Sequence, residues 1–228
     1  MSPKGVAMKI TLLSLLAELG LLTLPSYAQL IDTSWVVQAS GTTQTLYTVK
    51  AVTRTVGWTG GAGGVVLRTT NGGYTWLGAG TVGGDVYALT AIDSLTALVC
   101  SYNATSARIH KTTNGGASWR TVDSVYSGFY DGVHIFDATS GYAVGDPTPP
   151  GAHWVLKRTT DGGNTWFSAA TLQGSGSEGG WNNSVMWLDR YNGWFGTNNS
   201  KVYRTTDGGE TWHPTPTNLG NPNSFAVC

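Results

Sequence analysis

Charged residues are scarce in this sequence, and their scarcity excludes several kinds of partner. Only 11% of the 228 residues are charged, and 13 basic residues balance 13 acidic ones. Lys and Arg form no cluster along the chain, so nucleic acid and anionic membrane surfaces are poor candidate partners. Cysteine is also scarce, with only Cys100 and Cys228. These two residues do not make a disulfide framework, although they could pair after export.

The motifs of common catalytic and cofactor sites are missing as well. The sequence contains no GxSxG, no phosphate-binding loop and no dinucleotide fingerprint. The histidines and cysteines form no pair at the spacing of metal ligands; the histidines are His110, His134, His153 and His213. We therefore expect neither a metal nor a cofactor. His134 stands in an expected inner strand, where we expect a hydrogen-bonded core histidine rather than a ligand.

The first 28 residues have the features of a secretory signal peptide. Lys4 and Lys9 precede the apolar run ITLLSLLAELGLLTL, which is short for a membrane anchor and is interrupted by Glu18. Ser26 and Ala28 then fit a signal-peptidase site before Gln29. We predict that residues 1–28 are removed and that residues 29–228 form a secreted or periplasmic domain without stable membrane insertion.

What the sequence has in abundance is glycine, tryptophan and tyrosine, arranged in a repeat. The chain has 32 Gly, 10 Trp and 10 Tyr. RTTNGGYTW (68–76), KTTNGGASW (111–119), RTTDGGNTW (158–166) and RTTDGGETW (204–212) repeat at intervals of roughly 45 residues, and two apolar runs precede each copy. This period with strand-like composition is typical of β-propeller blades, each a four-stranded antiparallel sheet. We predict an all-β propeller with four complete blades in the chain.

The repeated phrase predicts a structural turn between the third and fourth strand of each blade. Its Asn or Asp can accept backbone N–H bonds across the turn, and its two glycines allow positive φ. A carboxylate function is excluded because two of the four copies have Asn. The residues assigned to these turns are Asn71, Gly72, Gly73, Trp76; Asn114, Gly115, Gly116, Trp119; Asp161, Gly162, Gly163, Trp166; and Asp207, Gly208, Gly209, Trp212.

This pattern resembles the Asp-box, or BNR, repeat found in sialidases, xyloglucan-type glycoside hydrolases and sortilin-like receptors. It is most similar to the photosystem II assembly factor (Ycf48-like) family and its secreted bacterial relatives, over about residues 30 to 228. The resemblance implies a propeller of about seven blades, so we expect the chain to be C-terminally incomplete. The alternative is that four blades close on themselves.

In a propeller, the loops entering the first strand and those joining the second and third strands emerge on one face. We expect a ligand or partner on that face, with aromatic side chains stacking on a peptide or a sugar. Ordinary loop packing is the alternative interpretation. The candidate residues are Phe129, Tyr130, Asp131, Asp146, His153, Trp154, Glu178, Trp181 and Asn182. Trp58, Tyr142 and Trp194 recur at one position of the second strand, so we expect them in the core.

An enzymatic function remains the main alternative. A sialidase-like site needs three arginines, a Tyr–Glu pair and an Asp, but the family's Phe-Arg-Ile-Pro motif is absent and three of the arginines occupy repeat positions. An inverting glycoside hydrolase needs only two carboxyl groups, which Asp131, Asp146 and Glu178 could supply. We favour a secreted, non-catalytic propeller that binds a protein or glycan outside the cytoplasm. A glycoside hydrolase is the first alternative, and an assembly factor for a membrane protein complex is the second.

Overall fold

The computed structural model describes residues 36–149 and 152–218. All the strands described below lie in the compact unit that begins at Gln38. The expected signal peptide, its cleavage site before Gln29 and Cys228 lie outside the described residues. The structure therefore does not test whether Cys100 pairs with Cys228.

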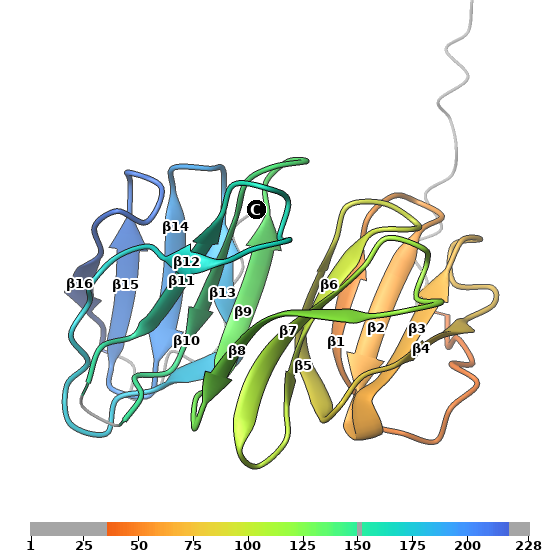
Figure 1. Cartoon of the computed structure of the whole chain (residues 1–228), viewed down its shortest axis with the longest axis horizontal. Helices are drawn as coiled ribbons and strands as arrows, with labels where there is room; N and C mark the ends of the chain where they lie inside the picture. The colour runs from red at the N-terminus through yellow and green to blue at the C-terminus, as the bar shows by residue number, and fades with distance from the viewer. Residues whose placement is uncertain (1–35, 150–151, 219–228) are drawn as a thin grey trace, which may run out of the picture. The chain divides into compact units, whose positions relative to one another are not determined.

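Four antiparallel sheets of four strands follow one another along the chain, from β1–β4 to β13–β16 (Figure 1). Sheet 1 contains β1 (Leu46–Ala51), β2 (Gly57–Gly61), β3 (Val65–Thr69) and β4 (Leu77–Thr81). Sheet 2 contains β5 (Asp85–Ala91), β6 (Ala97–Tyr102), β7 (Ser106–Thr112) and β8 (Arg120–Tyr126). Sheet 3 contains β9 (Tyr130–Ile135), β10 (Gly141–Gly145), β11 (Val155–Thr159) and β12 (Phe167–Ser168). Sheet 4 contains β13 (Gly180–Trp187), β14 (Gly193–Thr197), β15 (Lys201–Thr205) and β16 (His213–Pro216).

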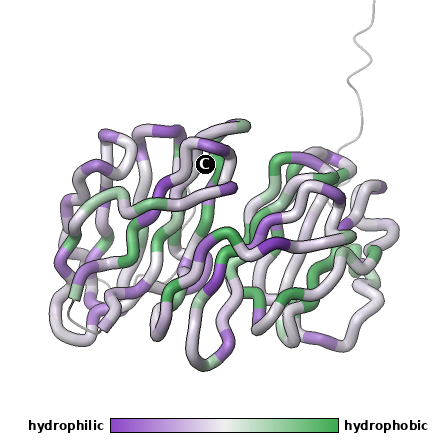
Figure 2. Tube along the Cα trace, in the orientation of Figure 1, coloured by the Kyte–Doolittle hydropathy of each residue, from purple (hydrophilic) through white to green (hydrophobic). Residues whose placement is uncertain are grey.

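Each sheet is a simple meander, because every strand pairs with the strand that follows it in sequence. Short hairpins impose this order, since tight turns place consecutive strands side by side. A single-turn 3₁₀ helix, Ala62–Gly64, joins β2 to β3. Among the described residues, no helix is long and apolar enough to cross a membrane. Hydrophobic stretches follow the strands, and many of the loops are hydrophilic (Figure 2).

The third and fourth strands of every sheet are joined by the same turn. In sheet 1, Thr69 Oγ1 donates a hydrogen bond to Asn71 Oδ1 at 2.9 Å, and the backbone N–H of Gly73 donates to Thr69 Oγ1 at 2.9 Å. The N–H of Thr75 donates to Asn71 Oδ1 at 3.0 Å. Sheets 2, 3 and 4 repeat these three bonds. Both glycines of each turn have φ between 71° and 88°, where residues with a side chain are strained.

The exchange of Asn for Asp changes one bond of this turn without changing its shape. Asn71 Nδ2 donates to the Thr75 hydroxyl at 2.9 Å. In sheet 3 the direction is reversed, because the Thr165 hydroxyl donates to Asp161 Oδ2 at 2.7 Å. A hydroxyl group can donate or accept, so it serves both side chains. The turn therefore needs an Asx residue and not a carboxylate.

Three hydrophobic clusters lie between consecutive sheets. Trp58 and Val66 of sheet 1 pack with Val99 of sheet 2. Leu98 and Ile109 of sheet 2 belong to a cluster with Tyr130, Ala143 and Trp166 of sheet 3. Tyr142, Val144, Trp154 and Leu156 of sheet 3 pack with Trp187, Phe195, Tyr203 and Trp212 of sheet 4. Burial of one such large side chain contributes roughly 2–3 kcal/mol. These clusters hold the sheets together.

In three of the four repeated phrases, the first residue links its sheet to the next one. Arg68 donates a hydrogen bond to the carbonyl of Ser94 in sheet 2. Lys111 Nζ donates to the Gly162 carbonyl of sheet 3 at 2.8 Å. Arg158 pairs with Glu210 of sheet 4. The side chain of Arg204 instead lies over the Trp194 ring, with its guanidinium carbon 5.6 Å from the ring centre.

The predicted core residues of the second strand behave differently from one another. Trp58 is fully buried and Tyr142 is 2% exposed, as predicted. Trp194 is only partly buried, so the prediction is wrong in degree for this residue. The reason is that no further sheet among the described residues covers its face, whereas Trp58 and Tyr142 are covered by the next sheet. The Trp residues that close the turns also differ in burial: Trp166 and Trp212 are buried, whereas Trp76 and Trp119 are partly exposed.

Candidate functional site

The first strand of each sheet is irregular close to its start. In β1, Tyr47 is an extra residue between the pairs Leu46–Gly61 and Thr48–Gly60. In β5, Tyr87 is the extra residue at the corresponding place, and in β9 it is Asp131. In β13 the irregularity lies between Gly180 and Val185. Bulges redirect side chains and are frequent beside functional sites. The irregularities of the four first strands therefore lie near the loops that enter these strands. The sequence predicts a ligand or partner on the face where those loops emerge.

An aromatic row connects three of the sheets at this level. The rings of Tyr47 and Tyr87 are stacked, with centroids 5.1 Å apart and planes inclined by 5°. Phe129 lies 5.2 Å from Tyr87 and 5.5 Å from Tyr102, measured between ring centroids. Tyr47 is 37% exposed, and the other three rings are partly exposed. Such a row offers flat apolar faces to a partner.

Only Phe129 of this row belongs to the residues predicted from the sequence. Tyr47, Tyr87 and Tyr102 were missed, because they lie within strands rather than in the long loops that carried the prediction. A signal for two of them was present, since Tyr47 and Tyr87 stand near the start of consecutive first strands. We define the aromatic row as Tyr47, Tyr87, Tyr102 and Phe129.

Two of the predicted carboxyl groups lie against the same segment, Gly179–Gly180. The N–H of Gly180 donates to Asp146 Oδ1 at 2.6 Å. A Cβ atom on Gly180 would collide with the carboxyl group of Asp131, so only glycine allows this approach. Asp131 is 2% exposed, and its Oδ2 has no hydrogen-bond partner among the described residues. The tertiary structure thus brings together Asp131 of β9, Asp146 directly after β10 and the start of β13.

These carboxyl groups are unusually easy to protonate. Burial raises the pKa of Asp131 well above its usual range, and the neighbouring charge of Asp146 raises it further. Burial also raises the pKa of Asp146, while the hydrogen bond from Gly180 opposes that change. A carboxyl group as buried as Asp131 cannot touch a ligand in solvent. Protonation of Asp131 therefore changes the stability of the fold and does not act through direct contact with a ligand.

Glu178 belongs to a separate polar cluster. Its side chain is fully buried, and its Oε2 accepts hydrogen bonds from the N–H of Ser175 at 3.1 Å and from the Tyr203 hydroxyl at 3.2 Å. Lys201 Nζ lies 3.4 Å from Glu178 Oε1. Burial and the charge of Glu178 raise the pKa of Tyr203 to about 12. This carboxylate ties the loop before β13 to β15, which is a structural role.

The remaining predicted residues are scattered. Tyr130 is buried, and its hydroxyl donates to Asp123. Trp154 is 3% exposed and packs against Phe195, with ring centroids 4.7 Å apart. His153 is exposed, Trp181 is 42% exposed, and Asn182 is partly buried. Within residues 36–149 and 152–218, no three His, Cys, Asp or Glu side chains are grouped so that they could hold a metal ion.

Solved structures with a similar fold are β-propellers. YCF48 from Cyanidioschyzon merolae matches with a TM-score of 0.54 and 15% identity, covering 80% of this chain and 62% of that one. The Niastella koreensis GH74 enzyme matches with a TM-score of 0.54 and 19% identity, covering 77% and 30%. The WD40 propeller domain of Doa1 matches with a TM-score of 0.50 and 14% identity, covering 73% and 52%. The chain therefore spans less than two thirds of each of these proteins.

No family model matches the chain, and no curated protein matches it. At identities of this size the similarity shows the fold and nothing finer. The four sheets are blades of a β-propeller, which confirms the predicted all-β propeller of four-stranded antiparallel blades.

Proposed function

We propose that this chain is a secreted, non-catalytic Asp-box propeller of the Ycf48-like kind, which binds a protein or glycan partner through the aromatic row. The observation that carries the proposal is the continuous row of Tyr47, Tyr87 and Phe129 where the first strands begin, in which Tyr47 and Tyr87 are stacked and Phe129 is tilted against Tyr87. Aromatic side chains lose little conformational entropy on binding and offer a large contact area. They stack equally on sugar rings and on the side chains of a peptide.

Burial of the candidate catalytic groups supports a binding role over catalysis. Asp131 and Glu178 are 2% and 3% exposed, so neither can protonate a glycosidic oxygen or activate a water at the surface. Partly exposed Asp146 accepts a hydrogen bond from Gly180. A hydrolase with two accessible carboxyl groups is therefore poorly supported by these side chains.

A glycoside hydrolase remains the second candidate, because Asp131 and Asp146 meet at Gly179–Gly180 and the pKa values of both are raised. One of two neighbouring carboxyl groups must be protonated to serve as general acid. This candidate requires a loop movement that exposes Asp131. It predicts turnover that Asp146→Asn abolishes.

The proposal is tested by presenting the purified protein to peptide and glycan arrays and titrating the best ligand. We expect saturable binding that falls at least tenfold in Tyr87→Ala and Phe129→Ala, because the stacking surface is removed. Tyr126→Ala is the matched control, since Tyr126 is 78% exposed and lies at the end of β8. Equal losses in all three variants, or an absence of saturable binding, would overturn the proposal. Turnover of a glycoside would favour the hydrolase.

Export is tested separately on the cell-grown protein. A signal peptide at residues 1–28 predicts a mature protein outside the cytoplasm whose first residue is Gln29. Mass spectrometry of the intact protein from the periplasm or medium measures this directly. Recovery of a cytoplasmic protein that retains residues 1–28 would contradict secretion without affecting the binding test.

A further inference from the structure

Residues of the first strands of all four sheets line a partly open cavity of about 290 Å³ that the proposed partner face does not use. Lys50 of β1, Thr90 of β5, His134 of β9 and Met186 of β13 line it. These four residues occupy the same register, because they pair with Trp58, Leu98, Tyr142 and Trp194 on the second strands. The cavity is therefore built by one position of the repeat, near the end of each first strand.

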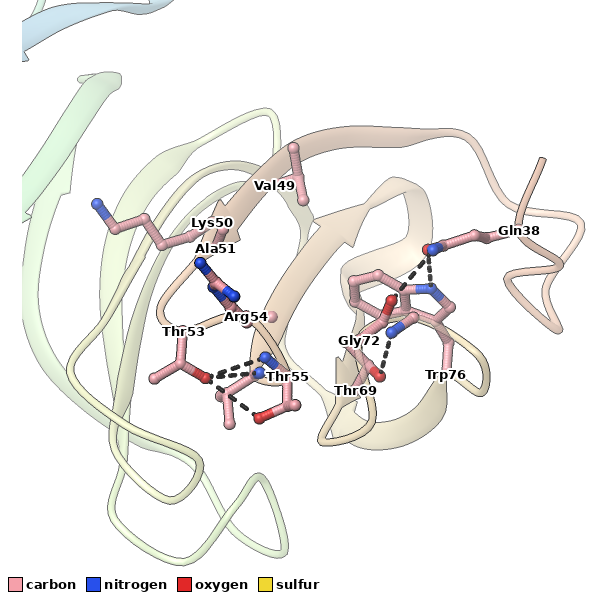
Figure 3. Close-up of a pocket in the computed structure, with 13 residues that line it drawn as sticks. Gln38, Val49, Lys50, Ala51, Thr53, Arg54, Thr55, Thr69, Gly72 and Trp76 are labelled. Atoms are coloured by element: carbon pink, nitrogen blue, oxygen red, sulfur yellow. Dashed lines mark hydrogen bonds between the residues drawn. The ribbon is translucent and has the colours of Figure 1, made fainter. Parts of the chain in front are cut away.

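The charge of this cavity is unbalanced. Lys50 is the cationic group, and no Asp or Glu is among the lining residues. No hydrogen bond or ion pair joins the Lys50 side chain to any described residue, in contrast to Lys111, Lys157 and Lys201. Figure 3 shows the Lys50 side chain directed away from Gln38 and Trp76, and all three residues also line a second pocket of about 170 Å³. An ammonium group without a partner favours a negatively charged occupant.

His134 contradicts its expected role as a hydrogen-bonded core histidine. It lies in β9 as predicted, and its ring lies 5.0 Å from Phe136, but it makes no hydrogen bond to a described residue. Burial lowers the pKa of His134 to about 4, and the charge of Lys50 contributes. The imidazole is therefore neutral near pH 7, and one ring nitrogen carries a proton that it can donate.

The rest of the lining is mostly apolar. Val133, Val185 and Met186 are among the apolar lining residues. The amide of Asn183 is already engaged with Thr48 Oγ1 and the Tyr47 carbonyl. The unused donors are thus the Lys50 ammonium, the Thr90 hydroxyl and the His134 ring N–H, from three different sheets. A volume of about 290 Å³ corresponds to about ten waters at roughly 30 Å³ each.

We propose that this cavity binds a small carboxylate whose charged end lies between Lys50, Thr90 and His134 and whose short apolar body contacts Met186 and Val185. A charge-assisted bond to Lys50 supplies the attraction, and the apolar wall selects a short hydrocarbon group over a hydrated inorganic anion. The carboxylate site does not include any residue of the aromatic row. The test of carboxylate binding is therefore separate from the test of the proposed partner face.

The experiment titrates butyrate into the full-length protein at constant ionic strength and pH 7, with uncharged butyramide as the matched ligand. Calorimetry gives stoichiometry, and NMR of the imidazole carbons follows His134. We expect one butyrate per chain, a His134 shift that saturates with the same dissociation constant, and binding of butyramide at least tenfold weaker. Equal binding of both ligands, or His134 resonances that stay in place, would overturn the proposal.

Variants distinguish binding at the cavity from a general effect of the protein's positive charge on butyrate. Lys50→Met should weaken butyrate binding at least tenfold, and Thr90→Val should weaken it by a smaller factor. Arg204→Met removes the same charge at an exposed position and should leave binding unchanged. Equal loss in Lys50→Met and Arg204→Met contradicts the site. If Lys50→Met fails to fold, Lys50→Gln replaces it, and the His134 shift in the unmodified protein still decides the question.

Discussion

The indole nitrogen of Trp76 donates a hydrogen bond to Gln38 Oε1 at 3.2 Å, and Gln38 Nε2 donates to the Gly72 carbonyl at 3.2 Å (Figure 3). In the next sheet, Trp119 Nε1 donates to the carbonyl of Ala79 in sheet 1 at 2.8 Å. Lys111 of sheet 2 likewise donates to the Gly162 carbonyl. The two hydrogen bonds of Gln38 therefore correspond to the bond that sheet 1 makes to Trp119 and the bond that sheet 2 makes to Gly162.

Removal of Gln38 should loosen the first sheet. We expect Gln38→Ala to lower the free energy of unfolding by about 1 kcal/mol, because two partly exposed hydrogen bonds are lost. Gln44→Ala is the control, since Gln44 is exposed in the same segment and its side chain has no hydrogen bond to a described residue. Urea unfolding followed by tryptophan fluorescence measures both. Equal effects of the two variants would show that the Gln38 contacts contribute nothing.

The link between sheets 2 and 3 should depend on Lys111. Its side chain is 9% exposed, so Lys111→Met leaves the Gly162 carbonyl without its partner and should cost about 1–3 kcal/mol. Lys111→Arg should recover much of the loss, because the other repeats have Arg at this position. Arg158→Met should cost less than about 1 kcal/mol, since its pair with Glu210 is exposed. Thermal and urea unfolding rank the variants, and the reverse order contradicts this account.

Asp131 should make stability depend on pH. Burial and Asp146 raise its pKa in the folded state, so the protonated form is favoured by folding. The contribution of Asp131 to the free energy of unfolding is fully present below the pKa of about 3.9 in the unfolded chain. It is lost as pH rises through the higher pKa of the folded state. We expect Asp131→Asn, which stays uncharged, to be more stable than the unmodified protein at pH 7, by about 1–3 kcal/mol.

The measurement is urea unfolding of both proteins from pH 4 to pH 8. The difference in unfolding free energy should be small at pH 4 and should grow with pH. Asp146→Asn is a second test, because removal of its charge should flatten part of the same dependence. A constant difference between the proteins at every pH would show that Asp131 does not titrate in this range.

Asp161 should have the opposite pH dependence. The backbone N–H and the hydroxyl of Thr165 both donate to its carboxylate and hold the pKa of Asp161 well below its usual range. The contribution of Asp161 to the free energy of unfolding is present above the pKa of about 3.9 in the unfolded chain. It is lost as pH falls through the lower pKa of the folded state. Asp161→Asn should abolish this acid dependence and keep the turn at pH 7, as Asn71 does. Asp161→Ala should cost about 1–2 kcal/mol at every pH above 4. Unfolding at pH 3 and pH 7 distinguishes the variants.

The proposed binding face was only partly predictable from the sequence. Phe129 was expected there and lies in the aromatic row, but Trp154 was expected beside it and is a core residue. Loop membership alone cannot separate these two outcomes, because the deciding factor is which ring the next sheet covers. The extra residues of the first strands, Tyr47, Tyr87 and Asp131, show no pattern in sequence that marks them as bulges.

The sequence by itself determined the four sheets and their repeated turns, because every contact that builds a turn lies within nine residues. Hydrogen bonds join Asn71 to Thr69 and to Thr75 within this one segment. Only the tertiary structure decided which carboxyl groups meet. Asp146 reaches Gly180 across 34 positions, and Asn183 reaches Thr48 across 135. Such contacts depend on how sheets pack against each other, and a local pattern of residues carries no record of that packing.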